Sequence, residues 1–545
     1  RAGLAELVAA SADEYVRLAV SLAGDGQRDR LRGLRAGLRQ RLVTSGLTDG
    51  PRFAAAFEDG LRTAWRDHCQ REQGPSPAPT LPAGTALVPM TGGTQVAVAD
   101  AINQLTTYVL TEQQDWFEDE IVFVRAAINR GERAIDIGAN HGVYALSLAR
   151  GVGADGLVWA FEPEPTAAAR LRLAIAANRF ANLTLVEMAL SDHSGTGHLS
   201  AGTHSELAAL ADSDGDDGVD DRSPGYDVPL ATLDEGAPRL GIRDVAFVKM
   251  DAEGSEPAII DGARRFFAQE SPLVMFEVRH GAAIHRPTVD AIARLGYERF
   301  RLVPGLMLLA PVDDPDALDP YQLNLFACKP DRAARLADRG LLVTRLRSAD
   351  DAPAQTWLTH LRPLAVAKAF GAGWRGAAGA GAVEQTYFAA LDHHALAQRP
   401  LDPPDSRYAH LMKAVELGAE ALAQWPEIPV LQTVARLAWE AGFRAVAVQT
   451  LNTLVQRCLE AGDPIASVPF LPACPRFDHV APLDDDLRRW VLAAAMEQRE
   501  RLRAFSSFYT ARDPQSRPTL ETMAALGYQS PEMARRLALI KQLTA

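Results

Sequence analysis

The sequence predicts an α/β fold in its middle part and helical regions on both sides of it. From about residue 87 to residue 330, short apolar runs typical of strands alternate with runs of helical periodicity. Residues 331–545 are rich in Ala and Leu and contain almost no strand-like run. Apolar strands separated by helices are typical of a parallel sheet that helices cover on both faces, so the middle part is expected to be Rossmann-like.

Each part follows from a local pattern. Residues 1–70 are predicted to be helical, because "SADEYVRLAVSLA" opens with a Ser cap and an acidic first turn and Leu recurs at helical spacing afterwards. Residues 71–85 are rich in Pro, Gly and Ser, which predicts a linker. The strand candidates, which give seven strands, are residues 134–137, 157–162, 183–190, 245–250, 273–278, 298–303 and 324–329. We therefore expect an α/β domain over residues 86–330 and an all-helical region over residues 331–545.

The helical region contains a pattern that is similar to one tetratricopeptide repeat. "VARLAWEAGFRAVAVQTL" places Ala435, Gly442 and Ala447 at the spacing of such a repeat. A second clear copy is hard to find, and small residues at helix crossings occur in any helical bundle. Both a repeat array and an ordinary bundle stay open. The Gly-rich stretch 371–382 is predicted to be a break within this region.

Length and composition limit the possible classes of protein. A chain of 545 residues is too long for one core and suggests three or more units. The formal net charge of −13, without clustered Lys and Arg, argues against a nucleic-acid partner. The apolar runs fall far short of the ~20 residues that span a bilayer, and four widely spaced cysteines fit a reducing compartment, so a cytoplasmic protein is expected. Residue 1 is Arg rather than Met, which leaves open whether an upstream part is missing.

The stretch "RAIDIGANHGVYALSLA" carries the first candidate site. It joins a strand that holds Asp136 to a helix through a turn that contains Gly138 and Gly142. Doubly wound folds bind ligands beyond the carboxyl ends of their strands, and glycines there permit close approach to the backbone. The G-x-x-x-G spacing lacks the third glycine that a dinucleotide pyrophosphate favours. A nicotinamide-dependent oxidoreductase is therefore disfavoured.

The second strand supplies the residue that distinguishes the ligand. It ends in Phe161-Glu162-Pro163, which places a carboxylate at a strand terminus. Such a carboxylate can accept hydrogen bonds from both ribose hydroxyls of an adenosine, and charge-assisted bonds are the stronger kind. S-adenosylmethionine carries ribose and adenine but no phosphate. It fits a turn without phosphate-binding features.

Five motifs in this order resemble the FkbM family of S-adenosylmethionine-dependent methyltransferases: "DIGANHG", "FEPEP", "ALSDHSG", "VKMDAEGSE" and "FEV". The preceding "LTEQQDWFEDEIVFVRAAI" is similar to the lead-in helix of that family, and the resemblance covers roughly residues 85–330. It implies a class I methyltransferase fold and S-adenosylmethionine as cofactor. By this resemblance, the cofactor-binding residues are Asp136, Gly138, Asn140 and Gly142 at the methionine end, Glu162 on the ribose, and Ser191 and Asp192 beside the adenine. For Asp192, a role in forming the turn before Ser194 stays open.

Methyl transfer needs an acceptor held in line with the methyl group, and an alcohol acceptor also profits from a base. The candidates for that base are Asp251, Glu253, Glu277 and His280, which follow the fourth and fifth strands. Asp251 and Glu277 could instead bind a divalent cation, but capping of nearby amides explains them without a metal, and none is expected. Lys249, in a buried strand, is expected to pair with a carboxylate.

Two further features are expected to be structural. His141 is predicted to be packed in its turn rather than catalytic. The acidic stretch 211–221 begins like a calcium loop, but Asp217 stands where that loop requires Gly, so a solvated loop near the acceptor entrance is expected.

Residues 2–69 resemble the C-terminal tail of family 41 glycosyltransferases, the O-linked N-acetylglucosamine transferase type. The nucleotide-sugar site of that family would lie upstream, so glycosyl transfer cannot be assigned to this chain, and an unrelated helical bundle stays open. The resemblance implies a fusion of a glycosyltransferase with a methyltransferase, in which the methyl group goes to a glycan.

Taken together, these features predict an S-adenosylmethionine-dependent O-methyltransferase that acts on a saccharide, glycan or natural product. The C-terminal helices are expected to offer a surface for a protein partner. The alternative from another class is a helical scaffold whose Rossmann unit binds nucleosides without turnover. Acidic groups at three strand ends favour the enzyme, because a scaffold has no need for them.

Overall fold

The computed structural model divides the chain into two compact units, Arg1–Thr80 and Leu81–Ala545. It describes residues 12–24, 26–43, 80–200, 225–280, 283–374, 376, 380–460, 467–483 and 486–544. The first unit contains helix α1 (Ala12–Ala23) and helix α2 (Arg28–Val43), as the sequence predicts for these residues. The remainder of the predicted N-terminal helices and most of the predicted linker lie outside the described residues.

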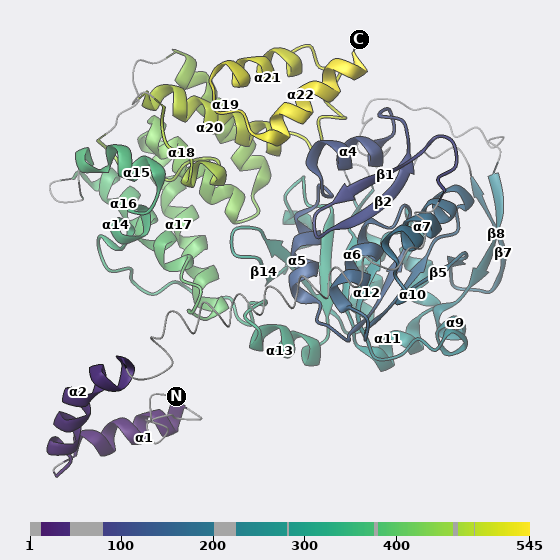
Figure 1. The fold of residues 1–545 in the computed structure, drawn as a ribbon, viewed down its shortest axis with the longest axis horizontal. Coiled ribbons are helices and arrows are strands. Elements are labelled where there is room, and N and C mark those ends of the chain that lie inside the picture. Colours follow the sequence, from purple (N-terminus) through teal and green to yellow (C-terminus); the bar gives the residue numbers. More distant parts are fainter. Residues whose placement is uncertain are drawn as a thin grey trace. The chain divides into compact units, whose positions relative to one another are not determined.

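The second unit is built on an eight-stranded mixed sheet (Figure 1). Its strands, in spatial order, are β14 (Leu308–Pro311), β13 (Glu298–Val303), β15 (Asn324–Cys328), β10 (Leu273–Glu277), β9 (Val245–Met250), β3 (Arg133–Ile137), β4 (Leu157–Phe161) and β5 (Leu183–Val186). Strands β10, β9, β3, β4 and β5 run parallel, whereas β15, β13 and β14 pair antiparallel. The seven predicted strands are present, and β14 is an additional edge strand.

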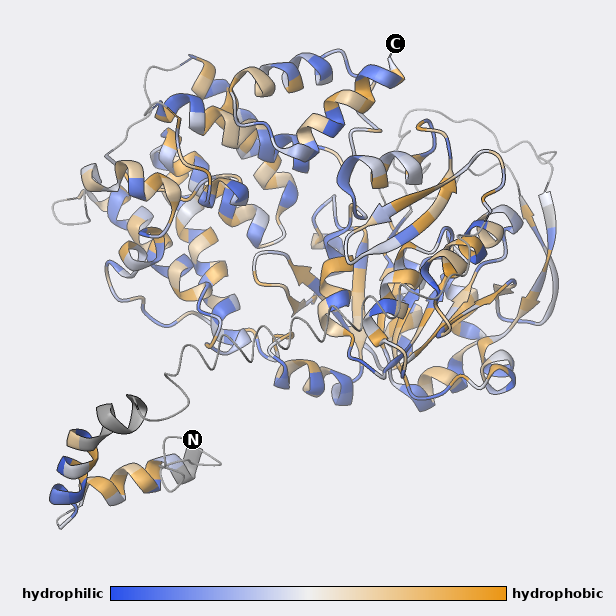
Figure 2. Cartoon of the chain, viewed as in Figure 1, coloured by the Kyte–Doolittle hydropathy of each residue, from blue (hydrophilic) through white to orange (hydrophobic). Residues whose placement is uncertain are grey.

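Alternate side chains of the sheet enter two different apolar clusters. Ala134 and Phe247 belong to the cluster on one face, while Ile135 and Val248 belong to the cluster on the other. Such alternation places successive side chains of a strand on opposite faces, and both are buried here. The Rossmann-like prediction is therefore confirmed. Figure 2 shows the strands of this sheet coloured largely as hydrophobic.

Helices and three small sheets accompany the main sheet among the described residues. The helices are α4 (Leu105–Gln113), α5 (Asp119–Ala127), α6 (Val143–Val152), α7 (Pro165–Asn178), α9 (Leu233–Leu240), α10 (Glu256–Asp261), α11 (Arg264–Glu270), α12 (Arg286–Arg294) and α13 (Pro330–Asp338). The short strands are β1 (Thr85–Met90) with β2 (Thr94–Ala99), β6 (Ala189–Leu190) with β8 (Gly225–Ala231) and β7 (Gly195–Ser200), and β11 (Arg279–His280) with β12 (Ala283–Ile284).

The predicted strand 183–190 is wrong in its second half. Strand β5 ends at Val186, and Ala189 and Leu190 pair with β8 in the three-stranded sheet instead. The chain turns between them, where the amide N–H of Met188 donates to the carbonyl oxygen of Val186. The apolar run continues because both parts are partly buried, so composition alone could not locate the turn.

The C-terminal region is helical among the described residues, as predicted. Its helices are α14 (Thr356–Leu361), α15 (Ala365–Phe370), α16 (Ala382–Ala397), α17 (Pro404–Gln424), α18 (Ile428–Glu440), α19 (Arg444–Glu460), α20 (Leu487–Leu502), α21 (Ser516–Ala525) and α22 (Pro531–Leu543). Helices α16 and α17 pack together, and so do α18 and α19. None of these described helices combines the length and apolarity of a bilayer span.

The helical region is joined to the α/β part by a shared core rather than by a linker. Val303 and Leu308 of the sheet edge pack in one apolar cluster with Leu437 of α18. At a second contact, the buried Arg536 of α22 forms an ion pair with Glu112 of α4 at 2.7 Å. The predicted boundary at residue 330 therefore does not separate two compact units, because the edge strands bury their apolar side chains against the helices.

Candidate functional site

A cavity of about 550 Å³ lies at the carboxyl ends of β3, β4, β9 and β10. Seven predicted site residues line it: Asp136, Gly138, Asn140, Glu162, Asp251, Glu253 and Glu277. The acidic side chains among the described lining residues are Glu118, Asp136, Glu162, Glu164, Asp251, Glu253 and Glu277, and the basic ones are Lys249 and Arg170, with His141 beside them. The wall is therefore strongly acidic.

Asp136 ends strand β3 and is fully buried. Among the described residues, neither of its carboxylate oxygens has a hydrogen-bond partner, and Lys249 Nζ lies 3.9 Å from Oδ1. Burial raises the pKa of Asp136 to about 6, although Lys249 opposes this and the amide of Ala145 faces the carboxylate from α6. Orphaned acceptors are costly in a protein interior, so this wall fits a ligand that carries N–H donors or positive charge.

Glu162 is held by two backbone amides at the end of strand β4. The N–H of Asn140 donates to its Oε2 at 2.6 Å, and the N–H of Glu164 donates to its Oε1 at 2.8 Å. Only 6% of the residue is exposed, and burial raises the pKa of its carboxyl group to about 7. A carboxylate has about four lone-pair positions, so two remain for donors such as ribose hydroxyls.

The turn after β3 needs its glycines for protein packing as well as for a ligand. Gly138 has a φ of +75°, and a Cβ there would lie 1.8 Å from the carbonyl oxygen of Asp251. Gly142 precedes α6 at a φ of +84°, where a Cβ would lie 2.3 Å from Leu171 Cδ1. The sequence explained these glycines by close approach of a ligand. The structure shows that a neighbouring strand end and a side chain already exclude a Cβ.

Lys249 pairs with carboxylates, as the sequence predicts for a lysine in a buried strand. Its Nζ lies 2.9 Å from Asp251 Oδ2 and 5.1 Å from the ring centroid of Tyr144. Burial lowers the pKa of Lys249, but Asp251 and Asp136 outweigh it and the pKa is raised overall. Lys249 is therefore charged, and it links the ends of β3 and β9.

Glu277 ends strand β10 beside two other carboxylates. One ligand oxygen each of Asp251, Glu256 and Glu277 lies within 4.8 Å of the others. Glu277 Oε2 has no hydrogen-bond partner among the described residues. Burial, followed by the charges of Asp251 and Glu253, raises the pKa of Glu277 to about 9. This cluster could hold a hard divalent cation, but Lys249 already neutralises Asp251, and the amide of Ala252 donates to Glu256 at 2.7 Å.

Four of the predicted site residues do not line the cavity. Gly142 ends the turn directly before α6, and Ser191 and Asp192 follow Leu190, which does line the cavity. The exposed Asp192 accepts hydrogen bonds from Ser191 and His193, which lower its pKa. The side chain of His280 lies outside the described residues.

Other lining residues were missed by the sequence analysis. Glu118 precedes α5 and accepts a hydrogen bond from the hydroxyl of Tyr144 at 2.5 Å. Burial raises the pKa of Glu118. Asn324, at the start of β15, lines the cavity as well. Glu118 lies in the "DWFEDE" segment, which the sequence analysis treated only as a lead-in helix; its acidic residues before an apolar run were the available signal.

Residues 136–299 match the family model described as the methyltransferase FkbM domain. This part of the chain is an FkbM methyltransferase domain. The matched range includes the turn at Gly138, Glu162 and the acidic ends of β9 and β10. This match supports the predicted methyltransferase activity of the domain, and with it the predicted cofactor S-adenosylmethionine.

Curated relatives match the chain over short segments. The probable UDP-N-acetylglucosamine–peptide N-acetylglucosaminyltransferase SPINDLY of Arabidopsis thaliana is 40% identical over 72 residues, which is 13% of this chain and 8% of that protein. The SPINDLY protein of Petunia hybrida is 43% identical over 67 residues, 12% of this chain and 7% of that protein. The matches lie in the N-terminal segment, and the chain spans less than a tenth of either relative.

Solved structures of methyltransferases resemble the chain weakly. The methyltransferase FkbM from Methylobacillus flagellatus is 17% identical with a TM-score of 0.24, and the match covers 36% of this chain and 43% of that one. An S-adenosylmethionine-dependent O-methyltransferase from Thermotoga maritima is 14% identical with a TM-score of 0.23, covering 47% of this chain and 96% of that one.

Proposed function

We propose that the FkbM domain methylates a hydroxyl oxygen on a saccharide, glycan or glycosylated natural product. One observation carries the proposal: Asp136, Glu162 and Glu277, from three strand ends, line one cavity. This cavity offers places for a charged donor and a base for the acceptor in the same volume.

The cofactor side of the cavity comprises Asp136, Asn140 and Glu162. Asp136 has two buried orphan oxygens and Asn140 Oδ1 is likewise without a partner among the described residues, so both suit the donors of an amino-acid group. Glu162, fixed by two amides, suits the ribose hydroxyls. S-adenosylmethionine, when bound, supplies an electrophilic methyl group on a positively charged sulfur. Asp192 and Ser191 remain proposed contacts of the adenine.

Glu277 is the proposed base of the reaction. It has a free carboxyl oxygen in the wall and no ion-pair partner among the described residues. A group with a pKa of about 9 is protonated at neutral pH, but positive charge bound next to it favours its ionised form. Glu277 would then accept the hydroxyl proton of the acceptor, whose oxygen would take the methyl group that the cofactor supplies, with the C–S bonding electrons left on sulfur. Asp251 is occupied by Lys249, and Glu253 and His280 remain further candidates.

The acceptor class rests on the N-terminal matches. The matched SPINDLY proteins are named as N-acetylglucosaminyltransferases, and a methyltransferase attached to such a segment would meet sugars at its own site. We also propose that the helical region offers a surface for a protein partner, as the sequence analysis expected.

The test is methyl transfer from S-adenosylmethionine labelled in its methyl group to glycan fractions and defined sugars. We expect label on a sugar hydroxyl oxygen, and for Glu277→Gln a loss of at least 100-fold in kcat that exceeds any loss of cofactor affinity. Calorimetry with S-adenosylmethionine and its demethylated product provides the control for binding. Tight binding without transfer to any hydroxyl acceptor would refute the proposal and favour a nucleoside-binding scaffold.

A further inference from the structure

Strands β10 and β15 bring an unused donor and an unused acceptor together in the cavity of about 550 Å³. Glu277 and Asn324 are register partners in this antiparallel pair, and both line the cavity. Alternation along the strands places them on the same face as Met275 and Phe326, which are also register partners and belong to one apolar cluster. Directly opposite residues of an antiparallel pair have Cβ atoms ~4.5–5.5 Å apart, so the two polar side chains are close neighbours.

Asn324 has a buried N–H donor without a partner. Only 3% of the residue is exposed, and its Nδ2 donates to no acceptor among the described residues. The Asn324 amide weakly lowers the pKa of Glu118, which indicates that its N–H end faces the acidic wall, but no hydrogen bond joins these two described side chains. A buried donor without an acceptor is unfavourable, so this position favours a ligand oxygen.

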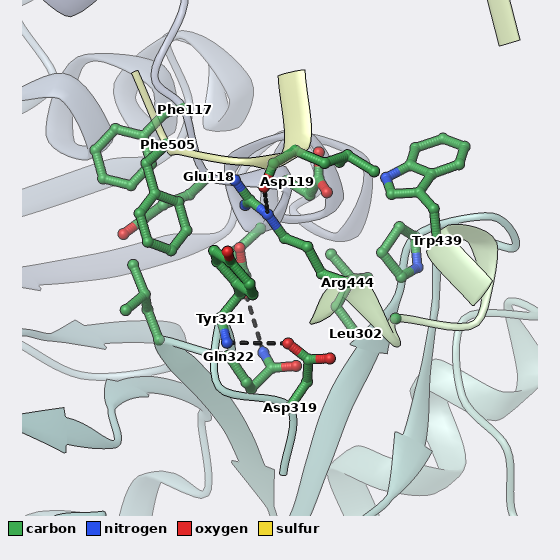
Figure 3. Close-up of a pocket in the computed structure, with 15 residues that line it drawn as sticks. Phe117, Glu118, Asp119, Leu302, Asp319, Tyr321, Gln322, Trp439, Arg444 and Phe505 are labelled. Carbon is green, nitrogen blue, oxygen red and sulfur yellow. Dashed lines mark hydrogen bonds between the residues drawn. The ribbon is translucent and has the colours of Figure 1, made fainter. Parts of the chain in front are cut away.

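The segment before Asn324 is fixed in part by the helical region. Gln322 Nε2 donates to the carbonyl oxygen of Asn324 at 2.7 Å. The N–H of Tyr321 donates to Asp319 Oδ1 at 2.9 Å, and the N–H of Ala445, at the start of α19, donates to Asp319 Oδ2 at 2.9 Å. Figure 3 shows Asp319, Tyr321 and Gln322 around a small cavity at this contact. The donor of Asn324 is therefore held at a defined place in the wall.

A hydroxyl group satisfies Asn324 and Glu277 at the same time. It donates one hydrogen, which suits Glu277 Oε2, also without a partner among the described residues, and it accepts through two lone pairs. One lone pair accepts from Asn324 Nδ2, and the other remains for the methyl group that the cofactor supplies. A neutral amine has one lone pair, so it cannot accept from Asn324 and also take the methyl group. A carboxylate has no proton to give and would repel Glu277.

We propose that Asn324 positions the acceptor oxygen and makes the domain selective for alcohols over amines. The hydroxyl proton passes to Glu277, and the C–S bonding electrons stay on sulfur. This inference rests on the proposed function, since it takes Glu277 as the base. It adds a residue that recognises the acceptor atom itself, and it applies to any alcohol, whether or not the alcohol is a sugar.

The test uses the full chain and S-adenosylmethionine labelled in its methyl group. The alcohols are the methyl glycosides of glucose, galactose, mannose, N-acetylglucosamine, rhamnose and fucose, together with glycerol, N-acetylserinamide and N-acetyltyrosinamide. For the best acceptor, the reacting hydroxyl is replaced by an amino group in one analogue and by hydrogen in another. We expect the wild type to prefer the alcohol over the amine by ~100-fold or more in kcat/KM.

Two variants of Asn324 test its role. Asn324→Ala removes the donor and should lower kcat/KM for the alcohol ~10-fold or more, the scale of one hydrogen bond to a buried group, with a smaller effect on the amine. Asn324→Asp keeps the shape without the donor and should act likewise. The ratio of kcat/KM for alcohol over amine therefore falls, which a partly unfolded sample would not produce. Asn452→Asp, at an exposed position of α19 that lines none of these cavities, is the matched control and should leave the ratio unchanged.

A measurement without turnover follows the amide group directly. The full chain is labelled with ¹⁵N-asparagine and saturated with the demethylated cofactor product, and Asn324→Ala assigns the side-chain resonance of Asn324. The alcohol should shift this resonance. The analogue with hydrogen in place of the hydroxyl should leave it unchanged.

The outcomes separate this inference from the proposed function. Methylation of a sugar hydroxyl with an unchanged alcohol-to-amine ratio in both Asn324 variants would overturn the inference and leave the proposed function intact. A non-sugar alcohol as the best acceptor, with a ratio that falls in both variants, would support the inference and overturn the saccharide as acceptor. Preference for the amine, or no transfer to any alcohol, would overturn both.

Discussion

Replacing Glu277 by Gln should make the cofactor-free protein more stable at alkaline pH, although the substitution removes the proposed base. The reason lies in the local charges. Glu277 is half-buried next to Asp251 and Glu256, and no described residue forms an ion pair with it. Gln has nearly the same shape but no charge, so it removes the repulsion and the desolvation of a carboxylate.

The size of the effect follows from the pKa. The pKa of the Glu277 carboxyl group rises from 4.5 to about 9 on folding. Between pH 4.5 and pH 9, the folded protein therefore keeps a proton that the unfolded chain has released. The free energy of unfolding therefore falls as pH rises through this range and is highest below the unfolded pKa. At about 1.36 kcal/mol per pH unit, three units from pH 5 to pH 8 give at most about 4 kcal/mol, and screening at the open side of the cavity lowers it to ~2–4 kcal/mol.

Urea unfolding of wild type and Glu277→Gln at pH 5, 6.5 and 8 measures this effect. We expect nearly equal midpoints at pH 5 and a higher midpoint for the variant at pH 8, with unchanged m-values. Asp136 and Glu162 have pKa values raised to about 6 and 7. For this reason, the urea midpoints of both proteins should still fall somewhat between pH 5 and pH 7. Glu416→Gln, at an exposed carboxylate, is the control without effect. Equal midpoints of wild type and Glu277→Gln at pH 8 would refute the reasoning.

Three further predictions concern the same cavity. Glu162→Ala should weaken S-adenosylmethionine binding in calorimetry by ~1–3 kcal/mol, the scale for a lost charge-assisted hydrogen bond. Glu187→Ala on the surface should leave this affinity unchanged. Unchanged affinity in Glu162→Ala would show that Glu162 does not bind the ribose. Gly138→Ala should lower the unfolding midpoint strongly, because its Cβ would lie 1.8 Å from a backbone oxygen. Gly131→Ala, which is also at positive φ but has open space around it, should cost only ~1–2 kcal/mol. Similar losses of stability in both variants would contradict the packing argument. The ratio of the affinities for S-adenosylmethionine and for its neutral demethylated product should rise at least threefold from pH 6 to pH 8. The reason is that ionisation of Glu162 and Glu277 strengthens their attraction for the cation. A constant ratio across this range would show that these groups do not interact with the sulfonium.

The order of strands and helices could be predicted from sequence because burial on both faces leaves a local record. Every strand of the parallel core is an apolar run, and each ends at a polar or turn residue. The edge strand β14 was missed, since "LLAP" is short and its partner is reached through a turn at Met307 with a φ of 49°. The shared core with the helical region was missed too. Its contact between Val303 and Leu437 joins residues far apart in sequence, and periodicity reports only which faces are apolar.

The site was predicted in outline because parallel strands bring their carboxyl ends to one edge. Asp136, Glu162, Asp251 and Glu277 meet there for that reason. Glu118 could not be assigned in the same way, because it precedes a helix instead of ending a strand, although it lines the cavity beside Tyr144. Nor could the sequence show that the amides of Asn140 and Glu164 would fix Glu162. That depends on the left-handed backbone at Asn140, with a φ of 47°.

The acidic wall explains how one cavity can favour both binding of the donor and loss of the product. Asp136 and Glu162 are buried and Glu277 is half-buried, and the pKa of each is raised because loss of contact with water disfavours its charge. A positively charged ligand relieves that cost, whereas a neutral one does not. Methyl transfer removes the positive charge of the sulfonium, and a proton taken up by Glu277 would remove one negative charge from the wall. On the proposed function, the wall therefore attracts the donor more strongly than the product, and the same carboxyl groups that destabilise the empty protein favour release of the product.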